Sequence, residues 1–137
     1  MRDQHDHVVV DVAIVGGGPA GLALARALAL QGVELVVVAA HSEWHATYGV
    51  WRDDVADCDL GGEVDTLVRG AWPTVRVVGK RQHLLQRPYV VFDNAHLRSS
   101  LLAGVQVQHD TAVQAEHTTD TTSLRLHSGA TITALLV

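Results

Sequence analysis

The stretch VVVDVAIVGGGPAG (residues 8–21) decides the fold that we expect for this chain. It begins with eight mostly β-branched and aliphatic residues, which are typical of a strand within a sheet. The glycine pattern GxGxxG follows directly at residues 16–21, and an alanine- and leucine-rich helical pattern covers residues 19–31. A second apolar run follows at residues 33–39. Strand, glycine turn, helix and parallel strand in this order predict an α/β fold with a Rossmann-like βαβ unit.

Each glycine of the pattern has its own physical reason. Gly16 lets the chain turn sharply out of the strand, Gly18 lets a pyrophosphate approach the backbone, and Gly21 lets the helix pack closely on the strand. The N–H groups and the dipole of the helix N-terminus attract phosphates. We therefore predict a dinucleotide-binding turn, with a glycine turn of purely structural role as the alternative. The candidate cofactor-binding residues of this turn are Gly16, Gly17, Gly18, Pro19, Ala20 and Gly21.

The end of the second strand departs from the usual pattern of dinucleotide folds. An acidic residue usually stands there and binds the ribose hydroxyls. Counting from the glycines places this position at Ala39, whose side chain accepts no hydrogen bond, and Ala40 follows it. Either backbone groups alone hold the nucleotide at Ala39, or the affinity is reduced, or Glu43 reaches the ribose from four residues further on.

Composition and charge exclude several classes of protein. The chain has 137 residues, of which 47% are hydrophobic, and this suits one small domain with an ample core. The formal net charge of −5 argues against a nucleic-acid partner. Cys58 is the only cysteine, which excludes an internal disulfide and fits a reducing, cytoplasmic compartment. The nine histidines are scattered, and we predict no metal site.

Signals for export or membrane insertion are missing from the sequence. The N-terminal residues 2–7 are polar and mixed in charge, unlike a signal peptide. The longest nearly apolar stretch, residues 21–40, contains charged side chains and is better divided into a helix and a strand than read as a membrane span. Peripheral contact with a membrane stays open.

The remaining chain is expected to alternate between short helices and β structure. We expect two short helices over residues 53–70 and strands over residues 74–78 and 84–92. A helix should follow over residues 94–103, with Asp93 or Asn94 as its N-cap. The last segment, residues 105–137, alternates between apolar and polar residues and predicts an additional β-meander that ends in a hairpin.

An aromatic-rich segment follows the second strand at residues 41–51. It holds two of the three tryptophans and one of the two tyrosines of the chain. Such a loop either packs on the sheet or lines a flat, apolar ligand. Together with the glycine turn, its sequence WHATYGVW (residues 44–51) resembles the start of the lycopene cyclases, whose usual pattern here is Trp-x-Asn-Thr-Tyr-Gly-Val-Trp. This chain has Ala46 in place of the asparagine. The sequence RPY (residues 87–89), followed by Asp93 and Leu97, is similar to a further pattern of the same family.

The resemblance implies a flavoprotein of carotenoid biosynthesis with an FAD/NAD(P)-binding fold. Such enzymes use reduced FAD, with NADPH as the electron source, and close the linear ends of lycopene into rings in a redox-neutral isomerisation. It further implies that the strand around Val113 offers backbone contacts to adenine, and that the helix carrying Arg98 helps to hold the cofactor, although a surface role for Arg98 is an equal alternative. Tyr48 and Trp51 are the candidate residues that line the flavin or the polyene, because aromatic faces stabilise cations. The sequence identifies no catalytic acid or base.

The apolar strand at residues 134–137 is the last segment of the chain. In the resembled family this strand leads into a further flavin-contacting turn and the substrate region. We therefore expect residues 1–137 to form an incomplete N-terminal part of an FAD/NAD(P)-binding domain, inactive by itself. A flavin-dependent monooxygenase or oxidoreductase, and a non-catalytic nucleotide-binding remnant, are the alternatives.

Overall fold

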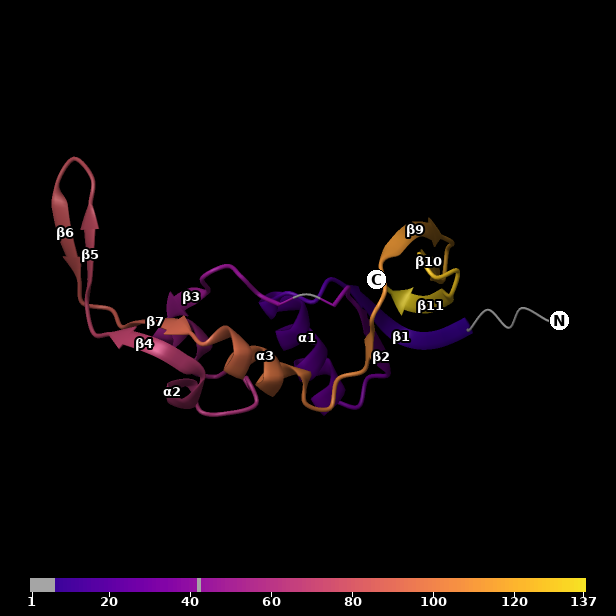
Figure 1. The fold of residues 1–137 in the computed structure, drawn as a ribbon, viewed down its shortest axis with the longest axis horizontal. Coiled ribbons are helices and arrows are strands. Elements are labelled where there is room, and N and C mark those ends of the chain that lie inside the picture. The colour runs from indigo at the N-terminus through magenta and orange to yellow at the C-terminus, as the bar shows by residue number, and fades with distance from the viewer. Residues whose placement is uncertain (1–6, 42) are drawn as a thin grey trace. The chain divides into compact units, whose positions relative to one another are not determined.

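The computed structural model describes residues 7–41 and 43–137 (Figure 1), so the polar residues 2–6 lie outside the described part. The chain forms two compact units. The first unit consists of Met1–Glu43 and Leu102–Val137, and the second of Trp44–Leu101. Each unit has its own sheet structure.

The first unit is built on a mixed six-stranded sheet in the order β8-β2-β1-β11-β10-β9. Strands β1, β2, β8 and β11 run parallel to their neighbours within this group, and β9, β10 and β11 form an antiparallel meander. The elements are β1 (His7–Val15), α1 (Pro19–Leu30), β2 (Leu35–Val38), β8 (Val107–Gln108), β9 (Ala112–His117), β10 (Thr122–Leu126) and β11 (Thr131–Leu136). This confirms the expected α/β fold with a parallel βαβ unit and an additional meander.

The two halves of strand β1 pair with different parallel strands. Its residues from His7 to Val12 pair with β11, and those from Val12 to Val15 pair with β2. At the change of partner, the N–H groups of both Asp11 and Val12 donate to the carbonyl of Glu34, at 2.9 and 3.2 Å. This irregularity interrupts the alternation of buried and exposed side chains along β1, as a bulge does.

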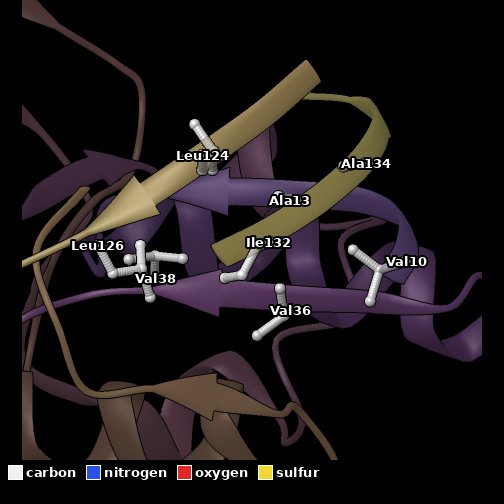
Figure 2. Close-up of a cluster of buried hydrophobic side chains, with 8 residues drawn as sticks. All are labelled: Val10, Ala13, Val36, Val38, Leu124, Leu126, Ile132 and Ala134. Atoms are coloured by element: carbon white, nitrogen blue, oxygen red, sulfur yellow. The ribbon is translucent and has the colours of Figure 1, made fainter. Parts of the chain in front are cut away.

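The core of the first unit lies between β1 and β2 on one side and β10 and β11 on the other (Figure 2). Its buried side chains are Val10, Ala13, Val36, Val38, Leu124, Leu126, Ile132 and Ala134. All four residues of β2 are buried, as expected for a parallel strand covered on both faces. Helix α1 contacts β2 and buries Leu22 and Ala25. The glycine turn therefore follows β1 at the point where this strand pairs with the fully buried strand β2.

The second unit combines a three-stranded antiparallel sheet, in the order β3-β7-β4, with a separate β5–β6 hairpin. Its elements are β3 (Gly49–Trp51), the 3-10 helix η1 (Arg52–Val55), α2 (Val64–Leu67), β4 (Val68–Trp72), β5 (Val75–Val78), β6 (Gln82–Leu85), β7 (Tyr89–Phe92) and α3 (Asn94–Leu102). Asp93 is the N-cap of α3, because its carboxylate accepts the N–H of His96 at 2.9 Å.

Three expectations for the second unit were wrong in detail. Residues 68–70 belong to strand β4 rather than to a helix, because β4 pairs with β7. Residues 49–51 form strand β3 on the other side of β7 instead of a loop. The expected strand over residues 84–92 is broken before Pro88, which lacks an N–H, and its two parts belong to different sheets.

Candidate cofactor site

The glycine turn joins the end of β1 to the start of α1. Gly16 has a φ of +117°, a backbone conformation that favours glycine, and its N–H donates to the carbonyl of Val38 at 2.9 Å. Gly18 is the N-cap of α1 in an extended conformation, and Pro19 is the first helical residue. Pro19 has no N–H, which costs nothing at this position. The turn is thus fixed both to β2 and to the helix.

The space around Gly17, Gly18 and Gly21 shows whether a larger side chain would fit at each position. A Cβ at Gly21 would lie 2.7 Å from the carbonyl oxygen of Gly16, so this glycine allows close packing of helix and turn. A Cβ at Gly17 would lie 2.8 Å from the Cβ of Ala39. By contrast, a Cβ at Gly18 would meet no atom of residues 7–41 and 43–137 within 4 Å. Packing therefore explains Gly17 and Gly21 but not Gly18, whose open side is available to a ligand.

The start of helix α1 has the properties of an anion site. The first helical hydrogen bond runs from the N–H of Leu22 to the carbonyl of Gly18, at 3.0 Å. The N–H groups before Leu22, including that of Ala20, point out of the helix without intrahelical acceptors. The first turn of α1 contains no acidic residue that would oppose a phosphate. An open glycine and a helix end with a partial positive charge therefore fit the diphosphate of a dinucleotide.

A hollow of about 220 Å³ lies beside the turn, within the first unit. It is lined by Val15, Gly16, Gly17, Val38, Ala39, Ala40, Asp110, Thr111 and Ala112. The structure thus brings Ala39 together with the glycine turn. The segment after β8, which is the parallel neighbour of β2, forms the opposite wall.

Asp110 is a residue of this hollow that sequence reasoning missed. Its carboxylate accepts the N–H of Thr111 at 2.7 Å and the N–H of Ser128 at 3.3 Å. The Ser128 hydroxyl and then the Thr111 N–H lower the pKa of Asp110, so a negative charge lines the hollow at neutral pH. Its position after a parallel strand is the signal that would have revealed it, because such strand ends form ligand sites in open α/β sheets.

Val113 lies next to the hollow, on the edge strand β9. The register between β9 and β10 shifts here: Ala112 pairs with Leu126 and Gln114 pairs with Arg125, so Val113 is the extra residue of a bulge. Its backbone is therefore outside the regular ladder, and its side chain is half exposed. This geometry is compatible with the backbone contact to adenine that the resemblance implies.

Residues 44–51 of the aromatic segment belong to the second unit and are held by Asn94. The amide of Asn94 donates to the carbonyls of Trp44 and Ala46, at 2.8 and 2.9 Å. The ring of Tyr48 meets that of Trp44 edge to face, with centroids 5.5 Å apart. Asn94 was expected only as an alternative N-cap, and the structure gives it this second role.

Trp51 takes part in a cluster of its own. Its ring meets that of Tyr89 edge to face at 5.1 Å, and the guanidinium of Arg87 lies 4.9 Å from its centroid. Arg87 also pairs with the carboxylates of Asp53 and Asp54, and it lowers the pKa of Asp53. The acidic segment after β3 therefore serves this ion-pair cluster.

Arg98 is partly buried on helix α3, in the second unit. Among the described side chains, its Nε is a buried nitrogen without a hydrogen-bond partner. The glycine turn, Ala39 and Val113 thus share the first unit, whereas Tyr48, Trp51 and Arg98 belong to the second.

Comparison with known proteins decides the family. The model of the "Lycopene cyclase protein" family matches residues 11–137. The chain belongs to the lycopene cyclase family. The lycopene beta cyclase of Capsicum annuum is 33% identical over 144 residues, which cover 100% of this chain and 28% of that protein. An uncharacterized carotenoid cyclase of Deinococcus radiodurans is 36% identical, covering 66% of this chain and 22% of its own length. This lycopene cyclase family member therefore spans about 28% of the length of the plant relatives.

Solved structures agree on the fold of this family member. The Diels-Alderase PyrE3 of pyrroindomycin biosynthesis matches with a TM-score of 0.70 at 20% identity, covering 96% of this chain and 31% of that one. A probable FAD-dependent monooxygenase of Pseudomonas aeruginosa, pqsL, matches with a TM-score of 0.69 at 18% identity. The match covers 90% of this chain and 40% of that one. The fold is thus that of the N-terminal Rossmann-like domain of FAD-dependent monooxygenases.

No helix in residues 7–41 and 43–137 is long and apolar enough to cross a membrane. Within the same residues, no three histidine, cysteine, aspartate or glutamate side chains gather closely enough to hold a metal ion.

Proposed function

We propose that this chain binds FAD through the glycine turn and serves the cyclisation of lycopene. The observation that carries the proposal is the open side of Gly18 at the N-terminus of α1, in a member of the lycopene cyclase family. No packing contact among the described residues requires a glycine there, whereas close approach of a pyrophosphate does.

The first unit supplies the groups that would hold the cofactor. Backbone N–H groups at the start of α1 bind the diphosphate, and the hollow beside Ala39 receives the adenosine half. The backbone of Val113, outside the ladder of β9, binds the adenine edge. Asp110 adds a carboxylate to the lining of the same hollow.

The chemistry that we propose is a redox-neutral ring closure. A proton adds to one end of lycopene, the cation closes the ring, and a second proton leaves. When bound, reduced FAD, with NADPH as the electron source, supplies the electron-rich group that stabilises the cation. Tyr48 and Trp51 are the proposed aromatic residues beside the flavin or the polyene. Tyr48 is positioned by Trp44, and Trp51 by Tyr89 and Arg87.

The experiment combines cofactor binding with a product assay. Purified chain is titrated with FAD, and flavin fluorescence reports binding. The full reading frame that encodes this chain is then incubated anaerobically with lycopene in lipid, FAD and NADPH, and ringed carotenes are separated by chromatography. Ringed products without consumption of NADPH beyond the amount that reduces the added FAD support the proposal. Oxygen-dependent NADPH consumption without ringed products would show a flavin oxidoreductase instead.

A further inference from the structure

Two histidine rings stack on each other beside the hollow next to the glycine turn. The imidazoles of His41 and His109 lie with their centroids 3.5 Å apart and their planes 13° apart. His41 directly follows Ala40, His109 directly precedes Asp110, and both of these neighbours line the hollow. All four residues belong to the first unit. The stack therefore joins the two segments that form opposite walls of the hollow.

The backbone explains why these two side chains meet. Strands β2 and β8 are parallel neighbours, and at their carboxyl ends the N–H of Ala39 donates to the carbonyl of Gln108, at 3.1 Å. The same carbonyl accepts the N–H of Asp110 at 2.9 Å, so His109 is the middle residue of a tight three-residue turn. The imidazole stack lies beyond these bonds and continues the link between the two strand ends.

We infer that the stack of His41 on His109 positions the adenosine half of the dinucleotide, which rests on the proposed binding of FAD in the hollow beside Ala39. Stacked aromatic rings hold two chain segments in one arrangement before a ligand arrives. A ligand that meets a preformed wall loses no affinity in ordering it. The two histidines act as one unit in this role, because each ring contributes through its contact with the other.

The stacked rings, rather than their nitrogen atoms, carry this role. A phenylalanine ring has a similar flat shape without a nitrogen, so His41→Phe/His109→Phe should keep the link between the two walls. Alanine at either position removes the link. Both histidines are exposed, so each alanine variant should fold normally. Each single alanine variant also tests the role by itself if the other one does not fold.

The test is titration of the full chain and its variants with FAD, followed by flavin fluorescence, and with ADP, followed by calorimetry. ADP contains only the adenosine and the diphosphate. We expect His41→Ala and His109→Ala each to weaken the binding of both ligands by about threefold to tenfold, the scale of one aromatic pair. The double alanine variant should bind as weakly as either single variant, since both changes remove the same contact. The phenylalanine pair should bind like the wild type, and so should the control His83→Ala, which removes an exposed histidine from β6 in the second unit.

The two ligands separate the role of the stack from FAD binding itself. Wild-type affinity of alanine variants that circular dichroism shows to be folded would overturn the role of the stack and leave FAD binding intact. Losses that add up in the double variant, or that the phenylalanine pair does not restore, would also overturn it, because each histidine would then act by itself. So would a loss for FAD without a loss for ADP, which would lie outside the adenosine half. A wild-type chain that binds ADP but not FAD would contradict only the proposed cofactor, and one that binds neither would overturn both.

Discussion

Valine substitutions at Gly18 and Gly21 should separate ligand binding from folding within a single turn. At Gly18, φ is −76° and ψ is 172°, which any residue adopts, and an added Cβ meets nothing within 4 Å. At Gly21, an added Cβ would lie 2.7 Å from a backbone oxygen that cannot move aside as a flexible side chain can. We expect Gly18→Val to fold normally and to bind FAD poorly, and Gly21→Val to be unstable even without FAD.

The magnitudes follow from these surroundings. Gly18→Val loses about 1 kcal/mol because valine is a poor N-cap, and it gains about 0.4–1 kcal/mol because the unfolded chain becomes less flexible. These effects nearly cancel. Gly21→Val overpacks a tight contact and should cost about 1–3 kcal/mol or more. For FAD, a side chain in the path of the pyrophosphate should weaken binding at least tenfold, about 1.4 kcal/mol.

Thermal and chemical unfolding with and without FAD measures both effects. At an FAD concentration of about 100 times the wild-type Kd, the wild type should gain about 2.7 kcal/mol, and Gly18→Val at most about 1.4 kcal/mol. Gly79→Val is the matched control, because a Cβ at Gly79 also meets nothing within 4 Å, outside the cofactor site. Stabilisation of Gly18→Val by FAD to the wild-type extent would refute a pyrophosphate site at this turn. Normal stability of Gly21→Val would refute the packing argument.

Three further predictions concern the ribose position, the aromatic segment and a helix cap. Ala39→Glu should tighten FAD binding by about 1–3 kcal/mol in fluorescence titration, as a hydrogen bond to a charged group does; unchanged affinity would mean that another group already holds the ribose. Asn94→Ala leaves two carbonyls of the aromatic segment without their donor and should cost about 1–3 kcal/mol in urea unfolding, whereas Asn94→Ser at wild-type stability would contradict a need for both bonds. The N–H of His96 lowers the pKa of Asp93 below 3.8, so the folded state is favoured above that pH and loses this contribution as pH falls through the lowered value. Asp93→Asn keeps a cap but should show a smaller loss of stability as the pH falls below the ordinary pKa of an aspartate, and an unchanged pH profile would exclude Asp93 as a source of acid sensitivity.

Much of the first unit could be predicted because its signals are local. The apolar runs of β1 and β2, the glycines between them and the helical pattern of α1 follow one another in about 30 residues. The separate roles of Gly16, Gly18 and Gly21 were predicted from the same pattern. The positive φ of Gly16 confirms its role in the sharp turn, and the tight contact at Gly21 confirms its role in close packing. The close approach of a ligand to Gly18 stays a prediction, which its open surroundings support.

The second unit was predicted less well because its strands depend on distant partners. Strand β3 has only three residues and becomes a strand by pairing with β7, about 40 residues later in the chain. Residues 68–70 lie next to a helical turn in sequence, and their pairing with β7 overrides that local tendency. The two hydrogen bonds of Asn94 to the aromatic segment likewise join residues about 50 positions apart.

The sequence by itself determined the βαβ unit, the glycine turn within it and the resemblance to the lycopene cyclases, since each rests on residues that are neighbours along the chain. Only the tertiary structure decided what surrounds that turn. It brought Asp110 into the same hollow as Ala39, because β8 returns beside β2 after an intervening unit of nearly 60 residues. It also left Val113 in a bulge at the sheet edge, since the register of β9 depends on its pairing with β10. Contacts of this kind are set by strand pairing over long separations, which no local pattern encodes.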